Sequence, residues 1–212
     1  MPLIFEEASN YNFDCSACSN RCDGRSKGVY LFDNDVAFSE DREKQLILQI
    51  NSVDGFFAKK CDKDGYPDIE VEYMPTGERL FIEVKVQRRT FMAIEKLLPN
   101  AELTPSQTMA LNLSDLVRYF QIHDNERCPV FILWCLLERP CIVPEGKTQY
   151  YYQDIETLKA IYYHYGDARR FRRKSGYGDV VNGQHKGVVV NYHFGLHELV
   201  PFRISYILDL IR

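Results

Sequence analysis

Apolar and polar residues alternate at period two in two neighbouring segments, which predicts a β-hairpin over residues 69–73 and 80–86. The segment Pro75–Glu78 between them has the residues of a turn. Alternation places one set of side chains on a core face and the intervening set on a mostly polar face. The expected core positions are Ile69, Val71 and Tyr73 in the first strand and Leu80, Ile82, Val84 and Val86 in the second.

The flanking segments predict further elements in the order helix, three strands, helix, strand. A helix capped by Ser39 is expected to run to about Ile50, and its buried stripe (Leu46, Ile47, Ile50) includes the carboxylate of Glu43. Residues 55–61 read as a strand before the hairpin. Thr104-Pro105 is expected to start a helix that ends at Phe120 or Ile122, and residues 130–137 read as a buried central strand. The fold class is therefore α/β.

The polar face of the hairpin carries an acidic cluster with one lysine. A turn centred on Thr76-Gly77 would put Glu70 opposite Glu83, and Asp68 opposite Lys85. Several carboxylates beside one lysine repel one another unless a hard cation neutralises them, and Mg²⁺ prefers carboxylate, carbonyl and water oxygens. Such an ion can hold a phosphate and lower the pKa of a bound water, so this face has the groups that phosphodiester hydrolysis needs.

Pro67-Asp68, fourteen intervening residues and Glu83-Val84-Lys85 resemble the signature of the PD-(D/E)xK nuclease superfamily. The resemblance spans about residues 40–137 and implies a restriction-endonuclease-like core, a Mg²⁺ or Mn²⁺ cofactor, and a nucleic-acid substrate, most simply DNA. It implies that Asp68, Glu83 and the Val84 carbonyl bind the metal, that Lys85 serves the attacking water, and that Glu43 joins the site. It also makes Gln107, on the helix expected after the strands, a weaker candidate. The alternative for the motif itself is an exposed hairpin whose Glu83 and Lys85 are merely solvated.

A cysteine-rich segment precedes this core. Cys15, Cys18 and Cys22 lie within eight residues, which is typical of a loop that wraps a soft metal, and Cys61, Cys141 or a histidine could supply a fourth ligand. The superfamily resemblance permits zinc or an iron–sulfur cluster here, and unliganded thiols are the alternative. Cys135, inside the apolar strand, is expected to be a core residue.

Basic residues are concentrated in two places although the whole chain is acidic, with a net charge of −4 and a pI near 5.8. This balance argues against coating of nucleic acid through overall charge, so contact must come from local patches or metal ions. Arg88 and Arg89 follow the predicted catalytic strand and are expected near the phosphate. The second cluster consists of Arg169, Arg170, Arg172 and Arg173. It can also bind phosphates, and the alternative is a solvated helix face.

The 212 residues suit one compact unit with three parts: a Cys-rich segment (1–38), the nuclease core (39–138) and a C-terminal extension (139–212). No export signal and no apolar stretch of membrane-spanning length is recognised, which favours a cytoplasmic protein without a membrane partner. The sequence predicts a metal-dependent DNA endonuclease of restriction or repair type, and a homodimer is compatible with double-strand cleavage. The competing hypotheses are a nucleic-acid-binding or assembly module that does not cut, and an RNA-directed nuclease.

Overall fold

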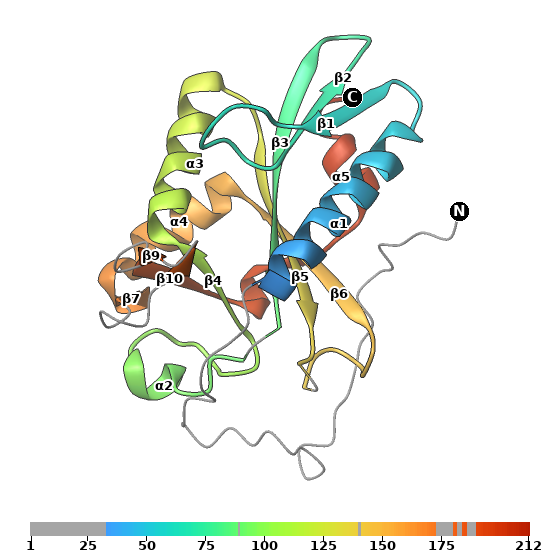
Figure 1. Ribbon diagram of the computed structural model, residues 1–212. Coiled ribbons are helices and arrows are strands. Elements are labelled where there is room, and N and C mark those ends of the chain that lie inside the picture. The colour runs from blue at the N-terminus through green and yellow to red at the C-terminus, as the bar shows by residue number, and fades with distance from the viewer. Residues whose placement is uncertain (1–32, 89, 140, 173–179, 182–183, 186–189) are drawn as a thin grey trace.

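The structure is a computed structural model that describes residues 33–88, 90–139, 141–172, 180–181, 184–185 and 190–212 (Figure 1). A six-stranded sheet in the order β1-β2-β3-β5-β6-β11 runs through its centre. β3 and β5 are parallel, and the other neighbouring strands are antiparallel. The strands are β1 (Phe56–Lys60), β2 (Ile69–Tyr73), β3 (Glu78–Gln87), β5 (Val130–Leu137), β6 (Thr148–Asp154) and β11 (Val200–Pro201). The expectation of a mixed α/β fold is confirmed.

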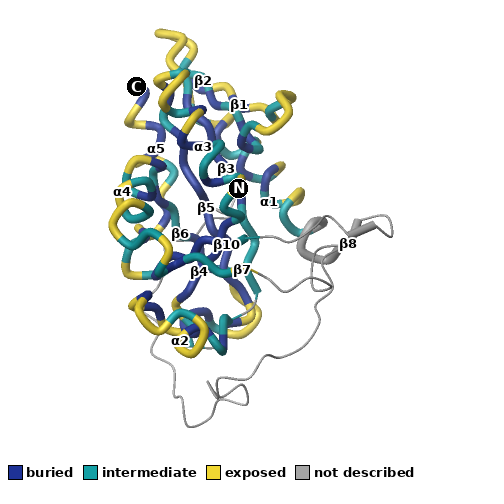
Figure 2. The backbone as a smooth tube through the Cα atoms, turned by 90° about the vertical axis from the view of Figure 1, so that its left-hand side faces the viewer, coloured by how far each residue is buried: buried dark blue, intermediate teal, exposed yellow. Residues whose placement is uncertain are grey.

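Helices cover both faces of this sheet, so that each face has its own core (Figures 1 and 2). α1 (Asp33–Asn51) and α5 (Ile204–Leu208) pack on one face, where the apolar hairpin positions are buried. α3 (Leu113–Glu126) and α4 (Ile155–Tyr165) pack on the other face around Trp134. β5, the predicted central strand, is buried along its whole length because both of its faces are covered.

The segment before α3 differs from the predicted helix over residues 104–122. Thr104 and Pro105 precede a turn in which the Gln107 amide and the Thr108 hydroxyl both donate to the Thr104 carbonyl. The chain then forms β4 (Thr108–Asn112), and the helix begins only at Leu113. β4 pairs with β10 (Val190–Gly195), some eighty residues later, and this pairing overrides the local helix signal.

Further elements complete the fold. β10 also pairs with β7 (Arg170–Arg172), which makes a three-stranded sheet in the order β4-β10-β7. The remaining elements are short: α2 (Ile94–Leu97), β8 (Val180–Val181), β9 (Gln184–His185), and the 3₁₀ helices Gly166–Arg169 and Leu196–Glu198. Within the described ranges, no helix combines the length and the apolar character needed to cross a bilayer.

Two local predictions about α1 and the hairpin turn need correction. α1 begins at Asp33, so Ser39 lies inside the helix, where its hydroxyl bonds to Glu43 instead of capping. The hairpin register is Ile69 with Ile82 and Glu70 with Phe81, two residues from the predicted one. The reason is the turn: the Tyr73 carbonyl accepts from the amides of Thr76 and Gly77, and Tyr73 pairs with Glu78. Gly77 has φ +74°, a conformation that favours glycine.

Candidate active site

The candidate site lies where two strands of the central sheet part. β2 pairs with β3 only as far as Ile69 and Ile82, whereas β3 continues beside β5 to Gln87. Beyond Ile82, no strand of the described residues pairs with β3 on its β2 side. There the Val84 amide donates to the Asp68 Oδ2 atom at 2.8 Å instead of to a strand. Because the amide and carbonyl of one strand residue point the same way, the Val84 carbonyl faces the same open edge.

Glu83 and Lys85 flank Val84 in sequence. Their side chains project from the face of β3 opposite to the face that carries the Val84 side chain. Glu83 is only 3% exposed, which excludes the alternative of a solvated hairpin, and its Oε1 atom forms an ion pair with the Lys85 ammonium group. About a third of the Lys85 side chain (32%) remains exposed. The face that the sequence marked as mostly polar is therefore covered by α3, and Phe81 on the same face is fully buried. Lys85 connects a buried carboxylate with solvent.

The electrostatics of this cluster are those of excess negative charge. Burial raises the pKa of Asp68, and the Glu43 charge adds to this, although Lys85 and the Val84 amide oppose it. Burial also raises the pKa of Glu83, with a further contribution from Asp68, against the opposing charge of Lys85. Burial alone would lower the pKa of Lys85, but the Glu83 and Asp68 charges outweigh it and the pKa is raised. One ammonium group leaves the carboxylates incompletely compensated.

Glu43 is the fourth predicted member of the site, and its inward orientation on α1 is confirmed. It is 7% exposed, accepts from the Ser39 hydroxyl at 3.4 Å, and lies 3.4 Å from the Lys60 ammonium group. Since α1 and α3 cover opposite faces of the sheet, Glu43 approaches Asp68 from the other side of the open edge. Its charge nevertheless acts on Asp68.

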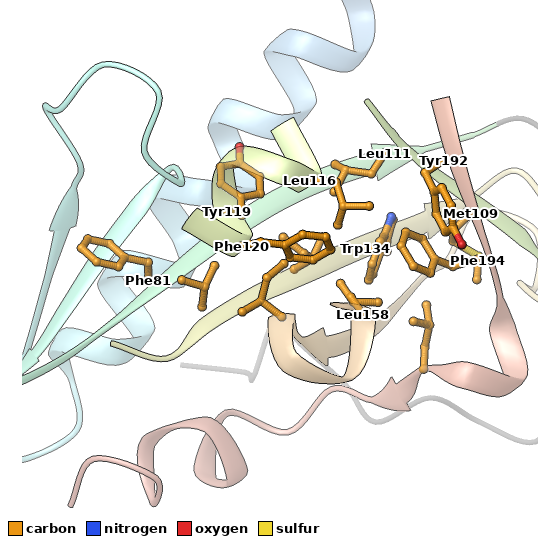
Figure 3. Packing of buried hydrophobic residues seen from close by; sticks show 14 of the residues in the cluster. Phe81, Met109, Leu111, Leu116, Tyr119, Phe120, Trp134, Leu158, Tyr192 and Phe194 are labelled. Carbon is orange, nitrogen blue, oxygen red and sulfur yellow. The ribbon is translucent and has the colours of Figure 1, made fainter. Parts of the chain in front are cut away.

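Two further residues, Asp115 and Tyr119 on α3, were missed by the sequence analysis. The Tyr119 hydroxyl forms a hydrogen bond with Glu83, and Asp115 acts electrostatically on Lys85. Figure 3 shows Tyr119 at the edge of the apolar cluster, with its hydroxyl pointing away from Leu116 and Phe120. The two residues are four apart on a helix and so share a face. This spacing would have identified both residues if the helix had been predicted at 113–126.

Several other predicted residues lie elsewhere in the structure. Glu70 is in the ladder opposite Phe81 and pairs with Arg79 at 3.0 Å and Lys59 at 3.3 Å, not with the site. Gln107 is exposed and precedes β4, so the premise that it lies on the helix after the strands is wrong. Cys61 is a half-buried free thiol. Cys15, Cys18, Cys22, Arg89 and Arg173 fall outside the described residues.

The described residues of the basic cluster do not share one helix face, because Arg169 ends a 3₁₀ helix whereas Arg170 and Arg172 belong to β7. Arg169, which was expected to bind nucleic acid, is completely buried; it contacts both Glu198 oxygens at 2.7 and 2.8 Å and the Ala101 carbonyl at 3.0 Å. It is therefore a structural residue. Arg170 pairs with Asp167 at 2.7 Å, whereas Arg172 is exposed. Arg88, at the end of β3, pairs with Glu138 at 2.5 Å.

The donor set at the open edge fits a hard divalent cation in its chemistry. It offers the carboxylates of Asp68 and Glu83 and the Val84 carbonyl, all oxygen ligands. Among the described residues, no three Asp, Glu, His or Cys side chains gather closely enough to form a metal site by themselves. A cation here would therefore depend on the backbone carbonyl and on water as well as on the two carboxylates.

Cys135 is buried in β5, as expected for a core residue.

Comparisons with known proteins give a structural resemblance and no match of sequence or family. No family model matches the chain, and no curated protein matches its sequence. A solved structure that resembles it is Hjc, a Holliday junction resolvase of Archaeoglobus fulgidus, an archaeal hyperthermophile. The superposition has a TM-score of 0.45 at 10% identity and covers 81% of this chain and 96% of that one.

Proposed function

We propose that this protein is a metal-dependent nuclease that hydrolyses phosphodiester bonds, with DNA as its substrate. The observation that carries this proposal is the open edge of β3, where the half-buried Asp68 and the buried Glu83 meet one lysine beside a backbone carbonyl. Burying this much uncompensated negative charge is costly for the fold. Such a cost is typical of a site that is completed by a ligand of opposite charge.

In this proposal each residue at the edge has a separate task. Asp68, Glu83 and the Val84 carbonyl hold Mg²⁺ or Mn²⁺, and Glu43 adds negative charge from the opposite face of the sheet. When bound, the cation polarises the scissile phosphate and lowers the pKa of a water ligand. Lys85 orients the attacking water through its ammonium group and offsets the charge that develops on the phosphate. Tyr119 holds Glu83 in place through its hydroxyl.

The test compares Lys85 with Lys59, a second lysine of the six-stranded sheet. Purified protein is incubated with single-stranded, duplex and branched DNA, and with RNA, in Mg²⁺ or Mn²⁺, with EDTA as the metal-free control. We expect cleavage that EDTA stops, and that Lys85→Ala reduces by about 10³-fold without unfolding the protein. Lys59→Ala is the matched control, since Lys59 pairs with Glu70 away from the edge, and it should keep wild-type activity.

The alternative is a module that binds nucleic acid on the same fold without cutting it. Binding without product release, across all these substrates and with both metals, would establish that alternative and exclude the nuclease. Cleavage of RNA alone would keep the site and correct the substrate.

A further inference from the structure

The position of Asp68 depends on the loop of residues 61–67 that delivers it to the edge of β3. Asp68 precedes the first residue of β2, so the strand ladder does not hold its side chain. At the start of the loop, the Cys61 amide donates to the Asp68 carbonyl at 2.8 Å. At its end, Tyr66 bonds to Glu126 through its hydroxyl and packs edge-on against Phe81. Lys63, in the middle of the loop, lies 3.6 Å from the same Glu126, and Gly65 has an anchor of its own.

Arg118 of α3 provides that anchor. Its Nε atom donates to the Gly65 carbonyl at 2.6 Å, and its Nη2 atom donates to the Asp115 carboxylate at 2.7 Å. Asp115 is further fixed by the Asn112 amide at 3.3 Å. Arg118 therefore joins the loop that carries Asp68 to the helix whose Tyr119 bonds to Glu83 and whose Asp115 acts electrostatically on Lys85.

The backbone conformation of Gly65 and the space around it suit a residue without a side chain. Its φ is +79°, and a Cβ atom there would lie 3.1 Å from Cδ and 3.2 Å from Nε of Arg118. A side chain at this position would be strained and would press on the guanidinium group. The close approach of the loop to Arg118 thus uses a residue without a side chain.

We propose that Arg118 is a positioning residue, which sets the place of Asp68 relative to Glu83 and Lys85 by fixing the Gly65 carbonyl to α3. This inference rests on the proposed function in taking Asp68 as a metal ligand. Arg118 acts through the loop and through Asp115, and it does not itself hold the metal. A supporting residue of this kind typically changes metal affinity about 10–100-fold when it is removed.

Amide hydrogen exchange tests the inference without any assay of activity. The Val84 amide reports the position of Asp68 because it donates to that carboxylate. The Lys85 amide points to the β5 side of the same strand and is the internal reference. We expect Arg118→Ala to accelerate exchange at Val84 about tenfold with little change at Lys85, and Arg118→Lys to restore part of the protection.

A second measurement links the loop to the metal. Binding of Mn²⁺ to the full-length protein, measured by calorimetry, should weaken at least about tenfold in Arg118→Ala. Asp124→Asn is the control on the same helix, since Asp124 pairs with Lys159 of α4 at 2.8 Å and lies away from the loop. It should leave both readouts unchanged.

Two results would overturn the inference. One is unchanged exchange at Val84 in Arg118→Ala. The other is parallel acceleration at Val84 and Lys85, which would show general loosening of the sheet. Neither depends on cleavage, so a protein that cuts nothing would refute the nuclease while the exchange data still decided the role of Arg118.

Discussion

Two groups of charged residues lie in and around the β2–β3 hairpin and differ in how their charges are balanced. The ion-pair ladder consists of Lys59, Glu70, Arg79 and Glu126, and the edge site consists of Asp68, Glu83 and Lys85. In the ladder, Glu70 contacts two cations, Arg79 at 3.0 Å and Lys59 at 3.3 Å. In the edge site, two carboxylates share the single ammonium group of Lys85.

The difference appears as opposite pKa shifts of chemically similar groups. Partial burial would raise the pKa of Glu70, but its bonds to Arg79 and Lys59 outweigh burial and the pKa is lowered. The pKa values of Asp68 and Glu83 are raised chiefly by burial, with a further contribution from the Glu43 charge to Asp68 and from the Asp68 charge to Glu83, and together these outweigh Lys85. Acidic residues that stabilise a fold have cationic partners. A carboxylate pair left short of positive charge is better explained by a ligand that supplies it.

The largest expected difference between the two groups is in the rate of DNA cleavage, when one carboxylate of each group is replaced by an amide. Glu83→Gln keeps the side-chain shape and removes the charge that is proposed to hold the metal, so we expect DNA cleavage in Mg²⁺ to fall by about 10³-fold or more. Glu70→Gln removes an equivalent charge from the ladder and should stay within about twofold of wild type. Initial rates on the best substrate of the panel measure both. Equal losses in the two variants would contradict the distinction.

Smaller effects of opposite sign are expected on the stability of the metal-free protein. A carboxyl whose pKa is raised on folding costs stability once it ionises, so Asp68→Asn should stabilise the protein at pH 7.5 by about 1 kcal/mol. The asparagine oxygen can still accept from the Val84 amide. Glu70→Gln should destabilise it by up to about 1 kcal/mol, since the lost charge was compensated.

The pH dependence of these two differences follows from the direction of each shift. Because folding raises the pKa of Asp68 above 3.8, the folded protein takes up this proton at a higher pH than the unfolded chain does, so the advantage of Asp68→Asn should narrow on acidification. The disadvantage of Glu70→Gln should persist down to about pH 4.5, the ordinary pKa of the unfolded chain, and should disappear as pH falls further through the lowered pKa of folded Glu70. Urea unfolding in EDTA at pH 7.5 and pH 5 measures both. The same sign in both variants at pH 7.5 would refute this account of the charges.

The sequence could predict that Glu83 and Lys85 lie together on one face of a strand, even though it misplaced the residues opposite them. The register was wrong by two residues, and because side chains alternate at period two, such a shift keeps every residue on its face. Glu83 and Lys85 therefore stayed together, whereas Glu70 was wrongly assigned to them. The exact turn was decided by the Tyr73 carbonyl and Gly77, which the alternation of the strands does not encode.

The roles of Tyr119, Asp115 and Arg118 could not be predicted because they depend on contacts distant in sequence. Placing α3 correctly requires β4, and β4 exists through its pairing with β10. Arg169 shows the same limit: a cluster of arginines suggested a surface patch, but Glu198 and the Ala101 carbonyl bury it. Local periodicity reveals which face a residue occupies, while long-range pairing decides what covers that face.

The single tryptophan of the chain allows a direct test of the central claim that the carboxylate pair holds a divalent cation. Trp134 on β5 is in register with Lys85 of β3, so it lies on the face that carries Glu83. Mn²⁺ is paramagnetic and quenches nearby indole fluorescence. Titration of the EDTA-treated protein with Mn²⁺ should quench Trp134 saturably in wild type and in Glu70→Gln, and Glu83→Gln should abolish the saturable phase. Quenching that is absent from wild type, or unchanged in Glu83→Gln, would contradict the claim.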